Sequence, residues 1–359
     1  MAQIKVALVT EALKRGKADR QKGDLDYIRF REEFRSVERG TIIVKDRVIH
    51  GYPHIKRIFT LEMGLKRNIG SDLTLFAEEK IDGFNVRIAC IDGKVSAFSR
   101  GGFLDLFVTE KARESAPIAK FFDDFPGYVL CGEMIGNTPY TAPTEGGDSE
   151  LFIFDIYHDD GVYVPCEERY ALLKKYKIAG VPVLGRFQSD DYKALRRTIL
   201  LLNKSRKEGM VLKTADRGNA VKYVTPWSDI EDIEGNSRLL FDMPIGFYHQ
   251  RVLRSAFFIE DFGLDHDAHA KMLGKAFYEG LCKAIETVKE GNEIAEEFEI
   301  LIKDQRIWDD IHRHMSKDVK VELVWKRPEK DKTRIRFRKI YKRTSRNLTA
   351  YSKGKGIAD

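Results

Sequence analysis

Cysteine is scarce in this chain of 359 residues, and the four cysteines are scattered. Cys90, Cys131, Cys166 and Cys282 form no CxxC pair, so neither a zinc ribbon nor a disulfide framework is indicated. This usage fits a reducing compartment, and we expect a cytoplasmic protein. Long apolar runs are also missing, because none approaches the ~18 residues that a membrane span requires. The sequence therefore predicts a protein that is neither exported nor bound to a membrane.

Internal repeats and low-complexity linkers are absent as well, which excludes repeat architectures. What is present describes a folded, charge-rich protein: 43% of the residues are hydrophobic and 33% are charged. The length favours two to three domains, each large enough to bury its own core.

Basic charge is concentrated near the C-terminus. The whole chain carries a net charge of only +6, yet thirteen lysines and arginines oppose two acids between Lys326 and Lys355. Phe337, Tyr341 and Tyr351 are interleaved with these cations. The pattern suits a polyanionic partner, and a solvated basic face without a ligand is the alternative.

The first two-thirds of the chain are predicted to be mostly β-structure. Residues 3–17 have helical spacing, and residues 27–50 alternate as short strands, so residues 1–60 are expected to form a small β-rich N-terminal module. From residue 61 to 235 apolar runs alternate with Gly and Pro, interrupted by helix-like stretches at 168–176 and 190–202. We expect an α+β domain of antiparallel sheets with flanking helices.

The composition becomes helical after Pro226. Helices are predicted at 237–241, 246–262, 266–290, 293–304 and 306–315, and the last 40 residues are expected to form a basic strand or helix segment. This divides the remainder into a helical domain at 236–300 and a basic C-terminal domain at 301–359. The sequence does not decide whether the helical block packs on its own chain or pairs with a second copy.

One stretch is a candidate for nucleophilic chemistry, Glu79-Lys80-Ile81-Asp82-Gly83. Lys80 follows a predicted strand and precedes a turn that contains glycine, which would hold its amine at the mouth of a pocket. Nearby cations or a metal can lower the pKa of such an amine, so that it attacks phosphorus. The KxDG tetrapeptide alone is weak evidence, and a lysine in a surface turn is the alternative.

Further charged clusters follow at predicted strand ends. Arg100 stands beside two glycines, Glu133 follows Gly132, and Lys222 lies in a short apolar run. Glu208 and Lys213 frame the stretch Glu208-Gly209-Met210-Val211-Leu212-Lys213. Each has a structural alternative, such as an exposed salt bridge or a lysine that protects an edge strand.

The order KxDG, SRGG, GE, FD, EGxVxK and KY resembles motifs I, Ia, III, IIIa, IV and V of the covalent nucleotidyltransferases. Within that superfamily, the chain is most similar to the archaeal homodimeric ATP-dependent RNA ligases, from Gly51 through the catalytic region into the helical block. The resemblance implies a ligase-type nucleotidyltransferase domain followed by a dimerisation domain and a small C-terminal domain.

The resemblance also implies roles for individual residues. Lys80 would form a phosphoramidate with AMP, supported by Asp82, and Glu208 would bind the divalent metal. The nucleotide would be held by the residues that match the family's other motif positions, which are Glu79, Asn85, Arg100, Glu133 and Phe154, with Phe154 stacking on adenine. Lys213 and Lys222 would neutralise the α-phosphate. Asn85, at the fifth place after Lys80, is similar to phage RNA ligases, whereas DNA ligases usually have arginine there.

The implied reaction is the joining of RNA 5′-phosphate and 3′-hydroxyl ends with ATP and Mg²⁺ (or Mn²⁺), by a homodimer. Single-stranded DNA with a 5′-phosphate would be a poorer substrate. The chain departs from the family pattern in having Lys222 alone in motif V and in lacking Cys-Pro within 103–107. No motif VI or OB-fold signature is evident, which argues against DNA ligases and capping enzymes. A DNA ligase, a capping-type nucleotidyltransferase and a non-catalytic nucleic-acid-binding relative are the alternatives.

Overall fold

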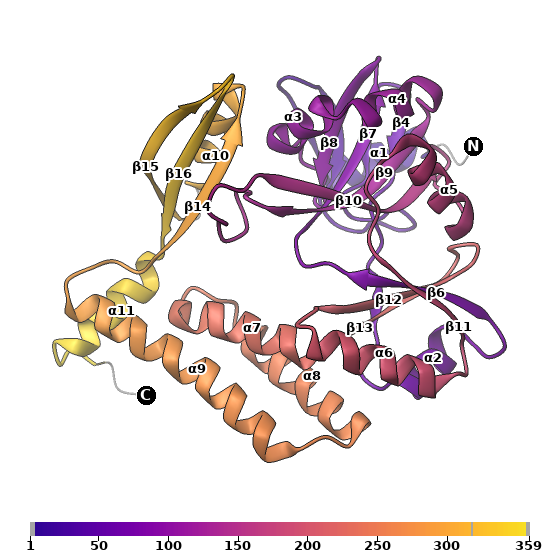
Figure 1. Ribbon diagram of the computed structural model, residues 1–359. Coiled ribbons are helices and arrows are strands. Elements are labelled where there is room, and N and C mark those ends of the chain that lie inside the picture. Colours follow the sequence, from indigo (N-terminus) through magenta and orange to yellow (C-terminus); the bar gives the residue numbers. More distant parts are fainter. Residues whose placement is uncertain (1–3, 317–318, 357–359) are drawn as a thin grey trace.

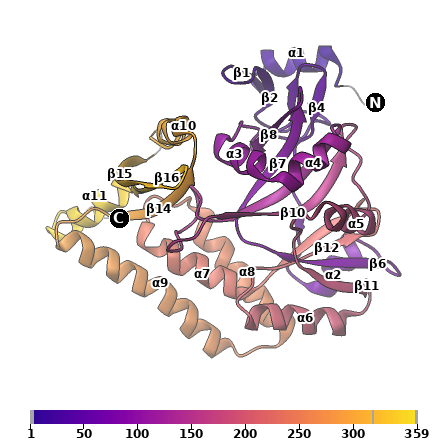
Figure 2. The same cartoon turned by 45° about the horizontal axis from the view of Figure 1, so that its top comes forward.

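The computed structural model describes residues 4–316 and 319–356. Its first unit is a small module in which helix α1 (Val6–Lys14) packs on a four-stranded antiparallel sheet. The strands follow in chain order as β1 (Ala18–Gln21), β2 (Tyr27–Phe30), β3 (Ile42–Val44) and β4 (Arg47–Ile49). This confirms the predicted helix and β-rich segment, although residue 3 of the predicted helix lies outside the described residues. Figure 2 shows the module at the top of the molecule, beside the catalytic region.

Two central sheets form the middle of the molecule (Figure 1). The four-stranded sheet is antiparallel in the order β10-β9-β7-β8. Its strands are β7 (Phe84–Ile91), β8 (Lys94–Ser99), β9 (Tyr128–Gly136) and β10 (Ser149–His158). The five-stranded sheet has the order β11-β6-β12-β13-β5. Its strands are β5 (Lys56–Arg57), β6 (Thr74–Lys80), β11 (Val183–Gln188), β12 (Gly209–Thr214) and β13 (Ala220–Val224), of which β5 runs parallel to β13.

Helices cover each central sheet and supply its core. On the four-stranded sheet lie α3 (Leu106–Glu114), α4 (Ala116–Asp124) and α5 (Cys166–Tyr176). On the five-stranded sheet lie α2 (Leu61–Asn68) and α6 (Tyr192–Lys204). Helices α5 and α6 confirm the predictions at 168–176 and 190–202. Helices α2, α3 and α4 were not predicted from the sequence. They are only about two turns long, so their stability depends on packing against a sheet and their apolar periodicity is too short to recognise.

The helical block follows β13 and lies beneath the central sheets in Figure 1. It contains α7 (Pro226–Asn236), α8 (Gly246–Phe262) and α9 (His266–Lys289). Helices α8 and α9 confirm the predictions at 246–262 and 266–290, whereas the predicted helix at 237–241 is a single 3-10 turn over Ser237–Leu239. Within the described ranges, no helix is both long and apolar enough to cross a membrane.

The C-terminal part contains a sheet where one helix was predicted. The helix expected at 293–304 is wrong, because Ala295–Ile302 forms strand β14 and pairs along its whole length with β16 (Lys332–Ile340). The glutamates of this stretch favour a helix, but its alternation buries Phe298, Ile300 and Ile302, and cross-strand packing overrides the local preference. Strand β15 (Lys320–Glu329) completes the sheet in the order β14-β16-β15.

Two helices flank this sheet. Helix α10 (Gln305–Met315) confirms the prediction at 306–315, and α11 (Lys342–Ser352) returns to pack on α9. The sheet shares one hydrophobic core with the four-stranded central sheet, since Phe298, Ile335 and Phe337 belong to the same cluster as Ile88 and Leu130. Strand β14 also spans the predicted domain boundary between residues 300 and 301.

Candidate functional site

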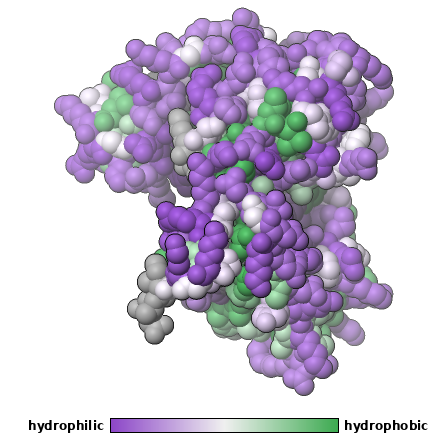
Figure 3. Space-filling model, turned by 90° about the vertical axis from the view of Figure 1, so that its left-hand side faces the viewer, coloured by the Kyte–Doolittle hydropathy of each residue, from purple (hydrophilic) through white to green (hydrophobic). Residues whose placement is uncertain are grey.

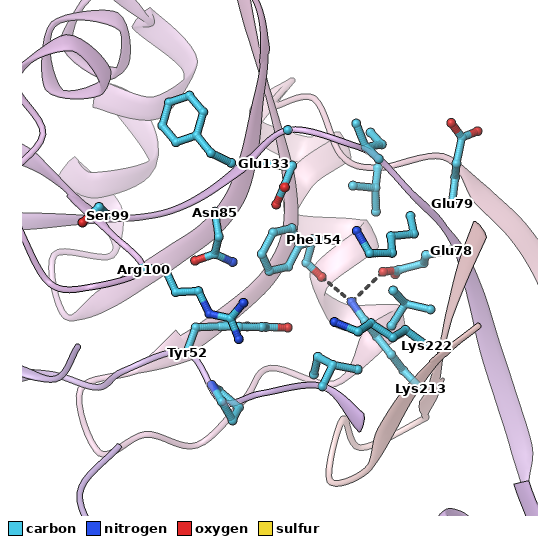
Figure 4. A pocket seen from close by; sticks show the side chains of 18 of the residues that line it. Tyr52, Glu78, Glu79, Asn85, Ser99, Arg100, Glu133, Phe154, Lys213 and Lys222 are labelled. Carbon is cyan, nitrogen blue, oxygen red and sulfur yellow. Dashed lines mark hydrogen bonds and ion pairs between the residues drawn. The ribbon is translucent and has the colours of Figure 1, made fainter. Parts of the chain in front are cut away.

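A pocket of about 590 Å³ lies between the two central sheets (Figure 4). Both sheets contribute: β6, β12 and β13 form one wall, and β7, β9 and β10 form the other. The residues that the sequence singled out and that line this pocket are Glu79, Lys80, Asn85, Arg100, Glu133, Phe154, Lys213 and Lys222. Segments more than 140 residues apart in sequence therefore meet at one cavity.

Lys80 is the last residue of β6, and after three intervening residues the chain enters the other sheet as β7. The turn requires glycine at position 83, because a β-carbon there would collide with the carbonyl oxygen of Met134 on β9. Lys80 Nζ donates to Glu208 Oε2 at 2.5 Å. The register explains this contact, since Gly209 pairs with Lys80 and Glu208 immediately precedes it. The amine is thus held at the junction of the two sheets.

Three carboxyl groups surround the Lys80 amine. Burial raises the pKa of Glu208 to about 6, although Lys80 opposes the rise. Burial likewise raises the pKa of Glu133 to about 7, and repulsion from Glu208 and Asp82 adds to it. The pKa of Asp82 is raised by burial too, with Asp232 of α7 contributing. Among the described residues no three acidic, His or Cys side chains lie close enough to hold a metal together. A divalent ion bound by one of these carboxylates would therefore take its other oxygen ligands from water or from phosphate.

The opposite end of the pocket suits an aromatic base and its sugar. Figure 4 shows the Phe154 ring, Asn85, Glu133 and Arg100 turned toward the same space. Asn85 pairs with Glu133 across β7 and β9, so both side chains emerge on one face. The Asn85 Oδ1 atom is buried without a hydrogen-bond partner. A buried acceptor of this kind indicates a donor that a ligand would supply.

Cations gather on the remaining side. Lys222 of β13 pairs in parallel register with Arg57 of β5, so the two side chains are neighbours. Burial, together with the charges of Arg57, Lys80 and Arg100, lowers the pKa of Lys222 to about 8. Within the described ranges, neither Arg57 nor Arg100 has an ion-pair or side-chain hydrogen-bond partner. Acids lie nearby, since Asp229 and Glu208 oppose the lowering of the pKa of Arg57, and Glu208 does so for Lys222. Because these acids form no ion pair with the two cations in the described ranges, the cations can still attract an anion.

Lys213 lies in a different environment from Lys222. Its Nζ donates to Glu78 Oε2 at 2.6 Å, to the Phe154 carbonyl at 2.7 Å and to Asp155 Oδ1 at 3.1 Å. These three bonds use all three of its N–H groups. The charge of Lys213 therefore lies in the pocket wall, within a network that also includes Arg169 and Arg217.

Two predicted residues lie at the periphery. Figure 4 shows the Glu79 carboxylate turned away from Phe154 and Lys222, and it pairs with Lys207 at 3.0 Å. Asp82 is not among the lining residues, and it faces Asp232 and Arg251 of the helical block. The remaining predicted site residues converge around the cavity or, for Glu208, bind Lys80 directly.

The sequence analysis missed several residues of the site. Arg57 is within the stretch that carries the family resemblance. The sequence does not show whether a single cation is exposed or half-buried, so it did not indicate that Arg57 belongs to the site. Glu78 lies two residues before Lys80 of the KxDG motif, and no feature of the sequence indicated a role for it. Asp232 and Arg251, which pair at 2.6 Å, reach the site only because the helical block folds back against it.

The comparison with protein families agrees with this geometry. Residues 73–224 match the model of the RNA ligase family, and residues 236–355 match that of the "Ligase Pab1020 C-terminal region". The first match covers both walls of the pocket, whereas the lining residues Tyr52, Pro53 and Ile55 precede it. The fold and the site therefore define a nucleotidyltransferase of the RNA ligase class.

Similar proteins extend over nearly the whole chain. An uncharacterized protein of Methanocaldococcus jannaschii is 32% identical over 90% of this chain and 87% of its own length. The solved structure of an "Archaeal ATP-dependent RNA ligase" matches with 26% identity and a TM-score of 0.89, covering 99% of this chain and 97% of the other. A "Putative ATP-dependent DNA ligase from Aquifex aeolicus" matches with 30% identity and a TM-score of 0.91, covering 99% and 100%. The chain belongs to the family of archaeal ATP-dependent RNA ligases.

Proposed function

We propose that this chain joins RNA 5′-phosphate and 3′-hydroxyl ends in three steps. The Lys80 amine attacks the α-phosphorus of ATP, forming an N–P bond and releasing pyrophosphate. An oxygen of the RNA 5′-phosphate then displaces Lys80 from that phosphorus, which gives an adenylated RNA end. Finally the 3′-hydroxyl attacks the 5′-phosphate and AMP leaves. The observation that supports this proposal most is the Lys80 amine at the junction of two sheets, bordered by acids and cations.

The residues around the pocket divide into two groups in this proposal. Phe154 stacks on the adenine, and Asn85, Arg100 and Glu133 bind the nucleoside. Glu79, whose carboxylate pairs with Lys207, lines the edge of the nucleotide site. Lys222 and Arg57 face the phosphates, and Lys213 adds positive charge from the wall. In-line displacement gathers negative charge on the phosphate oxygens, so fixed cations stabilise the transition state without reorganisation.

Proton transfer and metal binding fall to the acids. The Lys80 amine must lose a proton before it attacks, and Glu208 Oε2 is the acceptor it already contacts. Asp82 supports Lys80 by charge. Glu208 would also hold Mg²⁺ (or Mn²⁺), and the metal would neutralise phosphate charge.

Covalent labelling tests this proposal. Incubation with ATP labelled at the α-phosphate and Mg²⁺ should give an acid-labile protein adduct that is lost in Lys80→Ala. Lys94→Ala is the matched control, because Lys94 is exposed at the start of β8, and it should label like the unaltered protein. Labelling that persists in Lys80→Ala contradicts the proposal.

A second candidate is a DNA ligase, which the likeness to the Aquifex aeolicus structure favours. Asn85 supports RNA through the resemblance to phage RNA ligases, with single-stranded DNA as a poorer substrate. Parallel assays with 5′-phosphorylated RNA and with nicked DNA separate the two. Faster sealing of nicked DNA would replace RNA by DNA as the substrate, and labelling by GTP alone would indicate a capping-type enzyme.

A further inference from the structure

The basic C-terminal segment separates into two parts with different electrostatics. On strand β16, the arginines have carboxylate partners: Arg334 with Glu299 at 2.9 Å, Arg336 with Glu297 at 2.7 Å and Arg338 with Glu322 at 2.5 Å. Around α11, in the part of the chain that the structure describes, five cations have no ion-pair partner. They are Lys289, Lys342, Arg343, Arg346 and Lys353. A cluster of unpaired cations thus lies at α11, in addition to Lys326 and Arg327 of β15 and Lys339 of β16, which also have no ion-pair partner among the described residues.

Helix α11 presents this charge on one side. Thr344, Ser345 and Leu348 are buried, and Leu348 belongs to a cluster with Ala284 and Val288 of α9. Lys342, Arg346 and Lys353 recur at intervals of four and seven residues, which places them on the exposed side. The left-hand side of Figure 1, which faces the viewer in Figure 3, is covered mostly by hydrophilic side chains.

The five cations line an open groove of about 830 Å³ between α11 and the end of α9. Of the described lining residues, Glu293 is the one acid, and it pairs with Lys320 at 3.6 Å. Ser345 is the buried polar residue among the described lining residues, and its hydroxyl already accepts from the Ile294 N–H and donates to the Tyr341 carbonyl, so it is not free to bind a ligand. The groove would therefore bind a ligand through positive charge spread along its surface. Such a surface suits a polymer with regularly spaced negative charges.

We propose that this groove binds the sugar–phosphate backbone of the RNA substrate, at a distance from the ends being joined. The inference rests on the proposed function, which supplies the polyanion. Both ribbon views place α11 at the far end of α9, away from the sheets that hold Lys80 (Figures 1 and 2). The groove therefore contacts long RNAs that extend beyond the pocket, and short RNAs do not reach it.

A triple variant tests the groove, Arg343→Gln with Arg346→Gln and Lys353→Gln. Its protein–AMP labelling, which needs no RNA, should equal that of the unaltered protein. Its affinity for a long 5′-phosphorylated RNA should fall roughly tenfold, and the slope of log affinity against log salt should weaken by roughly two, since three phosphate contacts are lost. The affinity for a short RNA should stay the same.

The matched control removes the same charge from α6, as Lys193→Gln with Arg197→Gln and Lys204→Gln. These three are exposed and have no ion-pair partner within the described ranges, so the control separates the groove from net charge. A double variant Arg343→Lys with Arg346→Lys keeps the charge and should retain the affinity for long RNA.

Several results would overturn the proposal. One is an equal loss of affinity in both triple variants, and another is an equal loss for short and long RNA. A change in molecular mass with unchanged RNA affinity would assign the groove to a protein partner instead. Absence of labelling in the unaltered protein contradicts the proposed function, whereas the affinity measurements judge the groove independently.

Discussion

Lys222 is a lysine whose pKa lies close to neutral pH, because burial and three neighbouring cations lower it to about 8. Glu208 and Glu133 have pKa values raised to about 6 and 7. The acids must be ionised and Lys222 protonated for the proposed reaction. We therefore expect kcat/KM for labelling to be bell-shaped in pH, with limbs near 6–7 and 8.

Lys222→Arg tests the assignment of the alkaline limb. An arginine keeps its charge at every pH used, so the decline above pH 8 should move upward while the acid limb stays. Single-turnover labelling across pH measures both. An alkaline limb that is unchanged in the variant would show that another group causes it.

Asp155 belongs to the buried network that holds Lys213. Burial alone would raise its pKa, but Lys213, Arg217 and Arg169 hold the pKa well below its usual range. Because the folded pKa is depressed, Asp155 contributes stability above its unfolded pKa of about 3.9, and this stability is lost as the pH falls toward the folded pKa. Asp155→Asn should cost about 3–5 kcal/mol at neutral pH, since it leaves buried cations without their partner.

Denaturant unfolding checks this cost, and the difference between the two proteins should shrink in acid. Asp159→Asn is the control, because Asp159 is 42% exposed and pairs with Arg47 near the surface, so its loss should cost at most about 1 kcal/mol. Equal costs for the two variants would contradict a special role for the buried network.

At the scale of elements, the short strand β5 positions one of the cations of the proposed phosphate site, although it has only two residues. Its parallel pairing with β13 places Arg57 beside Lys222. Arg57→Ala should slow labelling roughly 10- to 100-fold, as expected for a lost hydrogen bond to a charged group. Lys56→Ala is the control, since alternation along the strand turns Lys56 to the exposed side. Equal rates for Arg57→Ala and the unaltered protein would exclude Arg57 from the phosphate site.

The sequence predicted elements well where periodicity alone decides them. Helices α8, α9 and α10 are long amphipathic stretches, and their predicted bounds lie within one residue of those observed. Strand β14 was predicted as a helix because its glutamates favour one, and only pairing with a strand 30 residues downstream reveals the strand. Lys80 and Arg100 stand at strand ends as the sequence predicted, whereas Glu133, Lys213 and Lys222 lie within β9, β12 and β13, so the order of the motifs identified them better than the strand ends did. The pairing of Arg57 with Lys222 depends on strand register, which the sequence does not specify.

At the scale of the whole molecule, the proposed homodimer has a candidate surface. Helices α8 and α9 expose large apolar side chains, among them Leu253, Phe257, Tyr278 and Ile285. Light scattering should give twice the chain mass of 41.3 kDa, and Tyr278→Asp with Ile285→Asp should shift it toward the monomer, because charge disfavours burial. Val162→Asp is an exposed control outside the helical block. A monomer at micromolar concentration would contradict the dimer.

The core that the C-terminal sheet shares with the four-stranded sheet affects the order in which the protein matures on the ribosome. Residues 73–224 leave the ribosome before β14 and β16 have been synthesised. Until then, the apolar surface of the four-stranded sheet that later packs against Phe298 and Phe337 is exposed to solvent. Lys303 and Asp304 later donate backbone N–H groups to Glu110 of α3 and close that surface. The nascent chain thus depends on its final segment, and premature termination would leave an aggregation-prone fragment even though every motif residue had been translated.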